Sequence, residues 1–239
     1  MSAAVRTLAF RGPVAVIGDI HGDLVLLDRL LARLGDMPVL FAGDVCDRGS
    51  DTRGVVERLI SQKCMGIRGN HEDWVRAWLG GDGFDRFALH PMMGGEHTLR
   101  SYGVEGRTTG EVNRQRSRVP AHHAAFFLDL PVVIDLTVGD EAYWLVHAGV
   151  PCTEVIRRMP MAEVVPWLAE RKPEALLWGS TEPDMGLPVD RPVIMGHMAQ
   201  RKPMDLGFVI AVDTGCSTTH HRALTAVILP ERRFVTVMP

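Results

Sequence analysis

Three polar clusters in the first third of the sequence carry side chains that can bind a cation or transfer a proton. They read GDIHGD (18–23), GDVCDRG (43–49) and GNHED (69–73), and two later stretches, VHAG (146–149) and MGH (195–197), each add a histidine. The candidate residues are Asp19, His21, Asp44, Asp47, Arg48, Asn70, His71, His147 and His197. Burying so many imidazoles and carboxylates together is costly, and divalent metal ions remove that cost. Such mixed donors suit Mn, Fe, Zn or Ni, and the set lacks the cysteines of a structural zinc site.

Each of the three early clusters directly follows an apolar run that predicts a buried strand. The predicted strands are 14–17, 39–42 and 64–67. A helical pattern follows each of them, over 23–35, 51–63 and 72–80. Alternating strands and helices at this spacing predict a parallel sheet with right-handed crossovers. Because ligands bind beyond the carboxyl ends of such strands, we expect the clusters to converge on one site.

The rest of the chain predicts a helical insertion followed by more strands. Residues from about 82 to 128 are mostly helical in pattern and indicate a cap beside the sheet. Strand patterns return at 131–150, with a hairpin turn at Gly139-Asp140, and at 191–197, 207–215 and 223–229. A proline-interrupted helical and loop segment lies at about 153–190. No shift in composition marks a boundary, so we predict a single domain over residues 1–239.

Composition and charge restrict the class of protein. The chain has 239 residues, 46% of them hydrophobic and 23% charged, which is ordinary for a globular protein with a sizeable core. A formal net charge of −3 gives no broad basic face, so we expect no nucleic-acid partner. No stretch resembles a membrane span or a signal peptide, and the scattered cysteines indicate reduced thiols. These features predict a cytoplasmic protein. The cysteines are Cys46, Cys64, Cys152 and Cys216.

Each cluster also has a simpler structural interpretation. The first could be a surface turn, the second could cap a helix and leave Arg48 in solvent, and the third could be a tight turn capped by Asn70. His147 or His197, taken alone, could be an ordinary histidine at a strand end. These interpretations fail jointly, because five strand-end clusters of one chemical character are hard to obtain by chance. We therefore predict a single metal site.

The order and spacing of GDIHGD, GDVCDRG and GNHE resemble the signature of the calcineurin-like metallophosphoesterases. The closer resemblance is to the serine/threonine phosphoprotein phosphatases, particularly their small bacterial and phage members. It continues through GGEHTLRSYGV, FFLDLPVVI, LVHAGV, GH and VDTG, so it spans most of residues 14–229. The fold that this resemblance implies is α/β, with two mixed β-sheets flanked by helices in an αββα sandwich.

The resemblance also implies roles for the matching residues. It implies two divalent metal ions, with Asp19 and His21 on the first, Asp44 bridging both, and Asn70, His147 and His197 on the second. It implies three catalytic residues, which are His71 as general acid, Asp47 as its partner and Arg48 as the phosphate clamp. Mn is the expected metal, with Fe, Zn or Ni as alternatives.

Elementary chemistry supports that assignment. Two divalent ions outweigh the charge of their carboxylate ligands and of a bridging hydroxide, so a phosphate dianion is attracted although the whole chain is acidic. A metal ion lowers the pKa of bound water to about 7, which supplies a bridging hydroxide for in-line attack on phosphorus. The leaving alkoxide needs a proton, which a histidine paired with a carboxylate can donate, and an arginine can bind two oxygens of the transferred group.

Some features fall outside this pattern. Small bacterial members often carry a second phosphate-binding arginine after a Trp in a W-x-R-E-like stretch, whereas this chain reads LLWGSTEPD at 176–184. Arg191 or Arg201 could replace it. Two histidine pairs, at 122–123 and 220–221, look like spare ligands, but neither follows a strand that points to the site, so we expect surface or cap positions. Trp74 and Trp78 are expected in the core, and Cys46 is expected to be a buried thiol.

Three functions remain open. The first is a metal-dependent phosphatase acting on phosphoserine or phosphothreonine in proteins. The second is a phosphoesterase for small molecules, such as a symmetrical dinucleoside tetraphosphate hydrolase. The third is a catalytically silent module that binds phosphoproteins, which the full set of metal ligands makes the weakest of the three. The sequence does not identify the physiological substrate, the oligomeric state or any regulatory partner.

Overall fold

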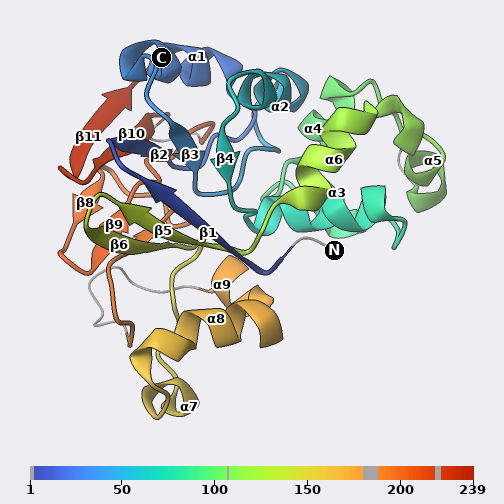
Figure 1. Ribbon diagram of the computed structural model, residues 1–239. Coiled ribbons are helices and arrows are strands. Elements are labelled where there is room, and N and C mark those ends of the chain that lie inside the picture. The colour runs from blue at the N-terminus through green and yellow to red at the C-terminus, as the bar shows by residue number, and fades with distance from the viewer. Residues whose placement is uncertain (1–2, 107, 180–187, 219–221) are drawn as a thin grey trace.

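Two β-sheets form the centre of the structure (Figure 1), a computed structural model that describes residues 3–106, 108–179, 188–218 and 222–239. The five-stranded sheet has the order β11-β10-β2-β3-β4. Its strands are β2 (Val14–Ile17), β3 (Val39–Phe41), β4 (Met65–Gly66), β10 (Leu224–Leu229) and β11 (Arg233–Val237). β2, β3 and β4 pair in parallel because helices connect them, whereas β10 pairs antiparallel with both of its neighbours.

The six-stranded sheet has the order β1-β5-β6-β7-β9-β8. Its strands are β1 (Val5–Phe10), β5 (Val133–Val138), β6 (Glu141–Leu145), β7 (Val193–Met195), β8 (Met204–Asp205) and β9 (Val209–Ala211). β5 and β6 form the predicted hairpin, with Gly139 at a positive φ of 60° in the turn. The remaining pairs are parallel except for β8 with β9, so both sheets are mixed.

Side chains along each strand point alternately to the two faces of its sheet, and together they form three stacked apolar layers. Val14 and Val16 of β2 point into a core shared with the other sheet, whereas Ala15 and Ile17 point to a core under the helices. This second core contains the buried leucines of α1 (Leu24–Leu34) and the buried valines of α2 (Thr52–Ser61). A third core lies between the six-stranded sheet and α8 (Met161–Arg171). In Figure 1, α1 and α2 lie on one side of the sheets and α8 on the other, which is the predicted αββα sandwich.

The helices that follow the polar clusters begin at side-chain or loop caps. Asp23 accepts a hydrogen bond from the Leu26 N–H at 2.9 Å, and Asp51 accepts one from the Gly54 N–H at 2.8 Å. The third helix, α3 (Asn70–Gly80), starts two residues before the predicted boundary because the chain turns into it at Gly69. The third cluster therefore sits within the first turn of α3.

The segment predicted as a cap contains short helices joined by turns, and no strand among its described residues. Its elements are η1 (Arg86–Leu89), α4 (Gly95–Ser101), α5 (Thr109–Asn113), η2 (Arg116–Arg118) and α6 (Ala121–Asp129). α4 and α6 pack on α2, and α6 also packs on α3. The second helical segment contains α7 (Glu154–Arg157), α8 and α9 (Pro173–Leu177).

The α/β fold class is confirmed, and the differences concern edges of the sheets. β1, β8 and β11 were not predicted, and each lies at the end of a sheet. The four cysteines are free, and Cys46 is buried as expected. Within the described part of the chain, no helix combines the length and apolar character needed to cross a lipid bilayer. That residues 1–239 form one domain stays a prediction.

Candidate metal centre

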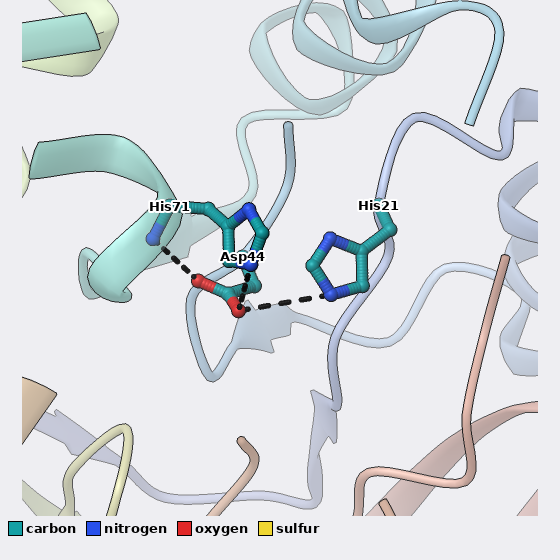
Figure 2. Close-up of side chains that lie close together, drawn as sticks. All are labelled: His21, Asp44 and His71. Carbon is teal, nitrogen blue, oxygen red and sulfur yellow. Dashed lines mark hydrogen bonds and ion pairs between the residues drawn. The ribbon is translucent and has the colours of Figure 1, made fainter. Parts of the chain in front are cut away.

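The polar clusters meet beyond the carboxyl ends of β2, β3, β4, β6 and β7. Asp44, in the turn after β3, lies between two imidazoles (Figure 2), with its Oδ2 atom 3.7 Å from His21 Nε2 and 3.8 Å from His71 Nε2. Its other oxygen, Oδ1, lies 3.4 Å from His147 Nε2. The Asp44 carboxylate is therefore the central group of the site, in contact with residues from three other strand ends.

The remaining predicted ligands surround this carboxylate. Asn70 Oδ1 lies 2.9 Å from His147 Nε2 and 3.0 Å from His197 Nδ1. Asp19 accepts hydrogen bonds from the His197 N–H and lies 4.0 Å from His21 Nε2. The structure thus brings all six predicted metal ligands together. At this centre, two groups of side chains have ligand atoms close enough for one cation each, and both contain Asp44: His21, Asp44 and His71; Asp44, His147 and His197.

Backbone carbonyls orient two of the imidazoles. His21 Nδ1 donates to the Cys46 carbonyl at 2.9 Å, and His147 Nδ1 donates to the Ala42 carbonyl at 2.8 Å. In neutral imidazoles these bonds place the hydrogen on Nδ1, so each Nε2 directs a lone pair toward the carboxylate of Asp44. Lone pairs that face carboxylate oxygens need a cation between them. A hydrogen bond from Nδ1 to a backbone carbonyl, with Nε2 left as the ligand atom, is typical of metal-binding histidines. The donor set therefore fits divalent ions.

The pKa shifts of the cluster also indicate that a positive charge would stabilise it. Burial raises the pKa of Asp19 well above its usual value, and the carboxylates of Asp213 and Asp44 raise it further. Burial opposes ionisation of His147, but the adjacent Asp44 carboxylate raises the pKa of this imidazole to about 10. Burial and the neighbouring His147 lower the pKa of His197 to about 4. A proton on His147 and a metal ion would satisfy the same need for a cation.

His71, Asp47 and Arg48 form a second unit at the edge of the cluster. His71 Nδ1 donates to Asp47 Oδ2 at 2.8 Å, and burial of the ring is outweighed by Asp44 and Asp47, which raise the pKa of His71. Arg48 places Nη1 2.8 Å from His21 Nε2 and Nη2 3.1 Å from His71 Nε2. Asp47 is held in turn by Trp74 Nε1 at 2.9 Å and by the Thr98 hydroxyl at 2.7 Å.

The backbone at the site is held in an unusual conformation. Among the described residues, nine that are not glycine have positive φ, and five of these belong to the candidate set: His21, Asp44, Asp47, Arg48 and His197. Each such conformation costs of order 1 kcal/mol or more, and such residues cluster at functional sites. The fold therefore maintains strain where the polar clusters meet.

Glu72 is a site residue that the sequence analysis did not single out. It lies in the first turn of α3, fully buried, and its carboxylate accepts hydrogen bonds from the N–H groups of Asp44, Val45 and Gly69 at 2.7–2.9 Å. The Cys46 thiol also donates to it, at 3.1 Å. Glu72 thus ties the second cluster to the third. Its position in GNHED was the only available signal, because a carboxylate that caps two loops has no distinctive sequence pattern.

Replacing Glu72 by glutamine is expected to lower the free energy of unfolding by about 3 kcal/mol. The amide nitrogen of glutamine would face buried N–H donors and leave at least one without an acceptor, which costs ~1–3 kcal/mol per group and more where a charged acceptor is lost. Chemical denaturation followed by circular dichroism measures this change. Glu170→Gln on the exposed face of α8 is the matched control, and equal stability of the two variants would contradict the role given to Glu72.

Several other expectations can be compared with the structure. Arg191 is paired with Asp135 and Asp190, both at 2.8 Å, so it is committed outside the cluster. Trp74 and Trp78 are buried in the core and stack on each other, as expected. The histidine pair at 122–123 lies in α6 of the helical cap. Ser180 and Thr181 of the LLWGSTEPD stretch and the pair at 220–221 lie outside the described residues.

A cavity of about 850 Å³ lies beside the cluster, and Arg48 lines it. The first turn of α1, the loop before α2 and the residues Ser217, Thr218 and Arg222 supply most of its wall. Two further arginines, Arg29 and Arg222, line it as well. Such a volume is in the range of small-molecule sites. Besides the three arginines, the helix-capping carboxylates of Asp23 and Asp51 line the cavity.

Comparison with known proteins places this geometry in context. The calcineurin-like phosphoesterase family matches residues 12–204. An asymmetrical bis(5'-nucleosyl)-tetraphosphatase PrpE of Oceanobacillus iheyensis is 24% identical over 94% of this chain and 91% of its own length. Serine/threonine-protein phosphatase 2 of Escherichia coli is 27% identical over 84% of this chain and 86% of its own.

Solved structures agree with the fold. The crystal structure of a putative diadenosine tetraphosphatase superposes with a TM-score of 0.63 at 21% identity, covering 98% of this chain and 97% of that one. At this identity the likeness concerns the fold alone. The family match, which covers most of the chain and all three early clusters, carries the assignment, and the chain belongs to the calcineurin-like phosphoesterases.

Proposed function

We propose that this protein hydrolyses phosphoesters with two divalent ions held by Asp19, His21, Asp44, Asn70, His147 and His197. The observation that carries the proposal is the position of the Asp44 carboxylate among imidazoles from separate strand ends, with two groups of ligand atoms sharing it. Mn²⁺ is the first candidate, with Fe, Zn or Ni as alternatives. When bound, such ions supply hydroxide at neutral pH and stabilise the charge of phosphoryl oxygens.

The chain's own residues would bind the phosphoryl group and protonate the leaving group. Arg48 would donate hydrogen bonds to phosphoryl oxygens, which would take its guanidinium away from the His71 ring. His71 Nε2 would then be free to carry a proton and donate it to the departing oxygen. Asp47 would hold the opposite ring nitrogen, and the carboxylates of Asp44 and Asp47 raise the pKa of His71 against the effect of burial, which favours its protonated form.

Among substrates open to the same attack on phosphorus, we propose a dinucleoside polyphosphate, cleaved at a phosphoanhydride bond, as the preferred one. The support is the cavity beside Arg48, whose additional arginines, Arg29 and Arg222, could bind a chain of phosphates. Four PrpE relatives are similar to this chain over 93–94% of its length, and they bear the name of asymmetrical tetraphosphatases. Phosphoserine or phosphothreonine in proteins is the second candidate, favoured by the clusters themselves and by the likeness to the phosphatase of Escherichia coli.

A substrate panel tests the function directly. We expect Mn²⁺-dependent release of product from diadenosine tetraphosphate, at higher kcat/KM than from phosphoserine or phosphothreonine peptides. Asymmetrical cleavage yields AMP and ATP, whereas the symmetrical cleavage considered from the sequence yields two ADP, so chromatography of the products decides between them. Arg222→Gln should lower kcat/KM on the dinucleotide about tenfold, which corresponds to one charge-assisted hydrogen bond of ~1.4 kcal/mol, and should affect an aryl phosphate less.

Arg171→Gln on α8, away from the cavity, is the control for that variant. A higher kcat/KM on phosphopeptides would reject the dinucleotide and retain the phosphoesterase. Failure of the metal-loaded protein to hydrolyse any member of the panel, combined with binding of phosphoproteins, would instead support the silent binding module.

A further inference from the structure

A second cluster of possible ligands lies on the helical side of the molecule, away from the metal centre. It joins Glu57 of α2 to the histidine pair at the start of α6, His122 and His123. Glu57 Oε2 lies 3.1 Å from His122 Nε2 and 2.8 Å from His123 Nε2. The two rings are nearly perpendicular, with centroids 4.4 Å apart, so both Nε2 atoms point at one carboxylate oxygen.

Burial divides the cluster into a fixed part and an accessible part. The His123 side chain is 1% exposed, whereas His122 is 55% and Glu57 is 60% exposed. The Tyr102 hydroxyl, buried behind the pair, lies 2.9 Å from His123 Nδ1. One imidazole is therefore positioned from behind by the core of the cap, while the open side of the cluster can receive an ion from solvent.

The chemistry of these donors matches that of a transition-metal site. If His123 Nδ1 donates its hydrogen to the Tyr102 oxygen, Nε2 carries a lone pair. In metal-binding histidines, a hydrogen bond of this kind at one ring nitrogen fixes the tautomer in which the other nitrogen binds the metal. Two imidazoles and one carboxylate are a known zinc ligand set that leaves a fourth position for water. Burial lowers the pKa of His123, and the hydrogen bonds of the two histidines lower the pKa of Glu57, so both side chains favour the forms that ligate.

We propose that Glu57, His122 and His123 bind one divalent transition-metal ion of the Zn²⁺ class. The ligands come from α2, which follows the second polar cluster, and from α6, the last helix of the cap. A bound ion would therefore link the cap to the helix layer that covers the five-stranded sheet. This site shares no residue with the metal centre, and it does not depend on the proposed phosphoesterase activity.

Equilibrium dialysis of the full chain against Zn²⁺ at neutral pH tests the proposal. We expect the unmodified protein to bind one more equivalent per chain than His122→Ala and Glu57→Gln, both of which change exposed side chains. His90→Ala, which removes an exposed histidine outside the cluster, should bind as many equivalents as the unmodified protein. Zn²⁺ should also raise the Tm of the unmodified protein more than that of either variant, because it binds the folded state.

Equal numbers of bound equivalents in the unmodified protein and both variants would overturn the proposal and leave the cluster as a set of hydrogen bonds. An unchanged circular dichroism spectrum and a cooperative thermal transition without Zn²⁺ report that the variants are folded, and neither readout needs hydrolytic activity. If one variant does not fold, the other decides, because each removes a different ligand.

Discussion

Replacing Asp44 by asparagine is expected to remove bound metal and hydrolytic activity together. The carboxylate lies 3.4–3.8 Å from imidazoles of three histidines, and both groups of possible ligands at the metal centre contain it. An amide would remove the negative charge and put N–H donors where a cation should sit. Since loss of an outer partner of a metal ligand already costs ~10–100-fold, we expect the loss of this shared ligand to lower turnover by more than about 100-fold.

Metal content after dialysis, measured by inductively coupled plasma mass spectrometry, should fall in parallel with turnover of an aryl phosphate. Asp140→Asn, in the exposed hairpin turn between β5 and β6, is a control with the same chemical change, and it should retain both metal and activity. An Asp44→Asn protein that keeps its full metal content would show that the carboxylate is not a ligand, whatever its activity.

The elements around the metal centre were predictable because local signals specify them. β2 and β3 are apolar runs followed by turns. The helices after them are capped by Asp23 and by Asp51, and the second cap therefore lies outside the cluster 43–49 that the sequence offered for it. β1 was missed because it pairs with β5, a strand far along the chain, and its outer positions are exposed. An edge strand of this kind has little apolar periodicity, and its partner is determined by the tertiary fold.

The sequence predicted which residues belong to the candidate site, but not the contacts that orient them. Asp19 and Asp44 follow neighbouring parallel strands of the five-stranded sheet, which brings them together. His147 and His197 follow β6 and β7 of the other sheet, so the packing of the two sheets is also needed. The orientation of each imidazole depends on backbone carbonyls such as that of Ala42, and the shape of the second cluster depends on Glu72. Such contacts join loops that are distant in sequence, and the type of the residue does not indicate them. The cavity has the same origin, because α1, the loop before α2 and residues near the start of β10, such as Ser217 and Arg222, form it jointly.

Replacing His71 by asparagine is expected to reduce turnover of an unactivated phosphomonoester while metal content stays normal. The backbone N–H of His71 donates to Asp44 Oδ1 at 3.1 Å, but the His71 ring comes no closer to that carboxylate than 3.8 Å. The ring is instead held by Asp47 at Nδ1 and faces Arg48 at Nε2. Asparagine cannot donate a proton at neutral pH, so the departing alkoxide would leave without help. General acid catalysis typically contributes ~10²–10⁴-fold, and we expect a loss in that range in kcat on a phosphoserine peptide.

The leaving group supplies the control for this prediction. An aryl phosphate departs as a weakly basic phenolate that needs less protonation, so the same variant should lose much less activity on it. Loss of a metal ligand would lower the turnover of both substrates equally and would lower the metal content. Loss of a general acid would lower the turnover of the alkyl ester much more than that of the aryl phosphate. Unchanged turnover of the alkyl ester in His71→Asn would remove His71 from proton transfer. Equal losses on both esters with depleted metal would make it a ligand instead, and the nearby Asp44 carboxylate would be the shared group.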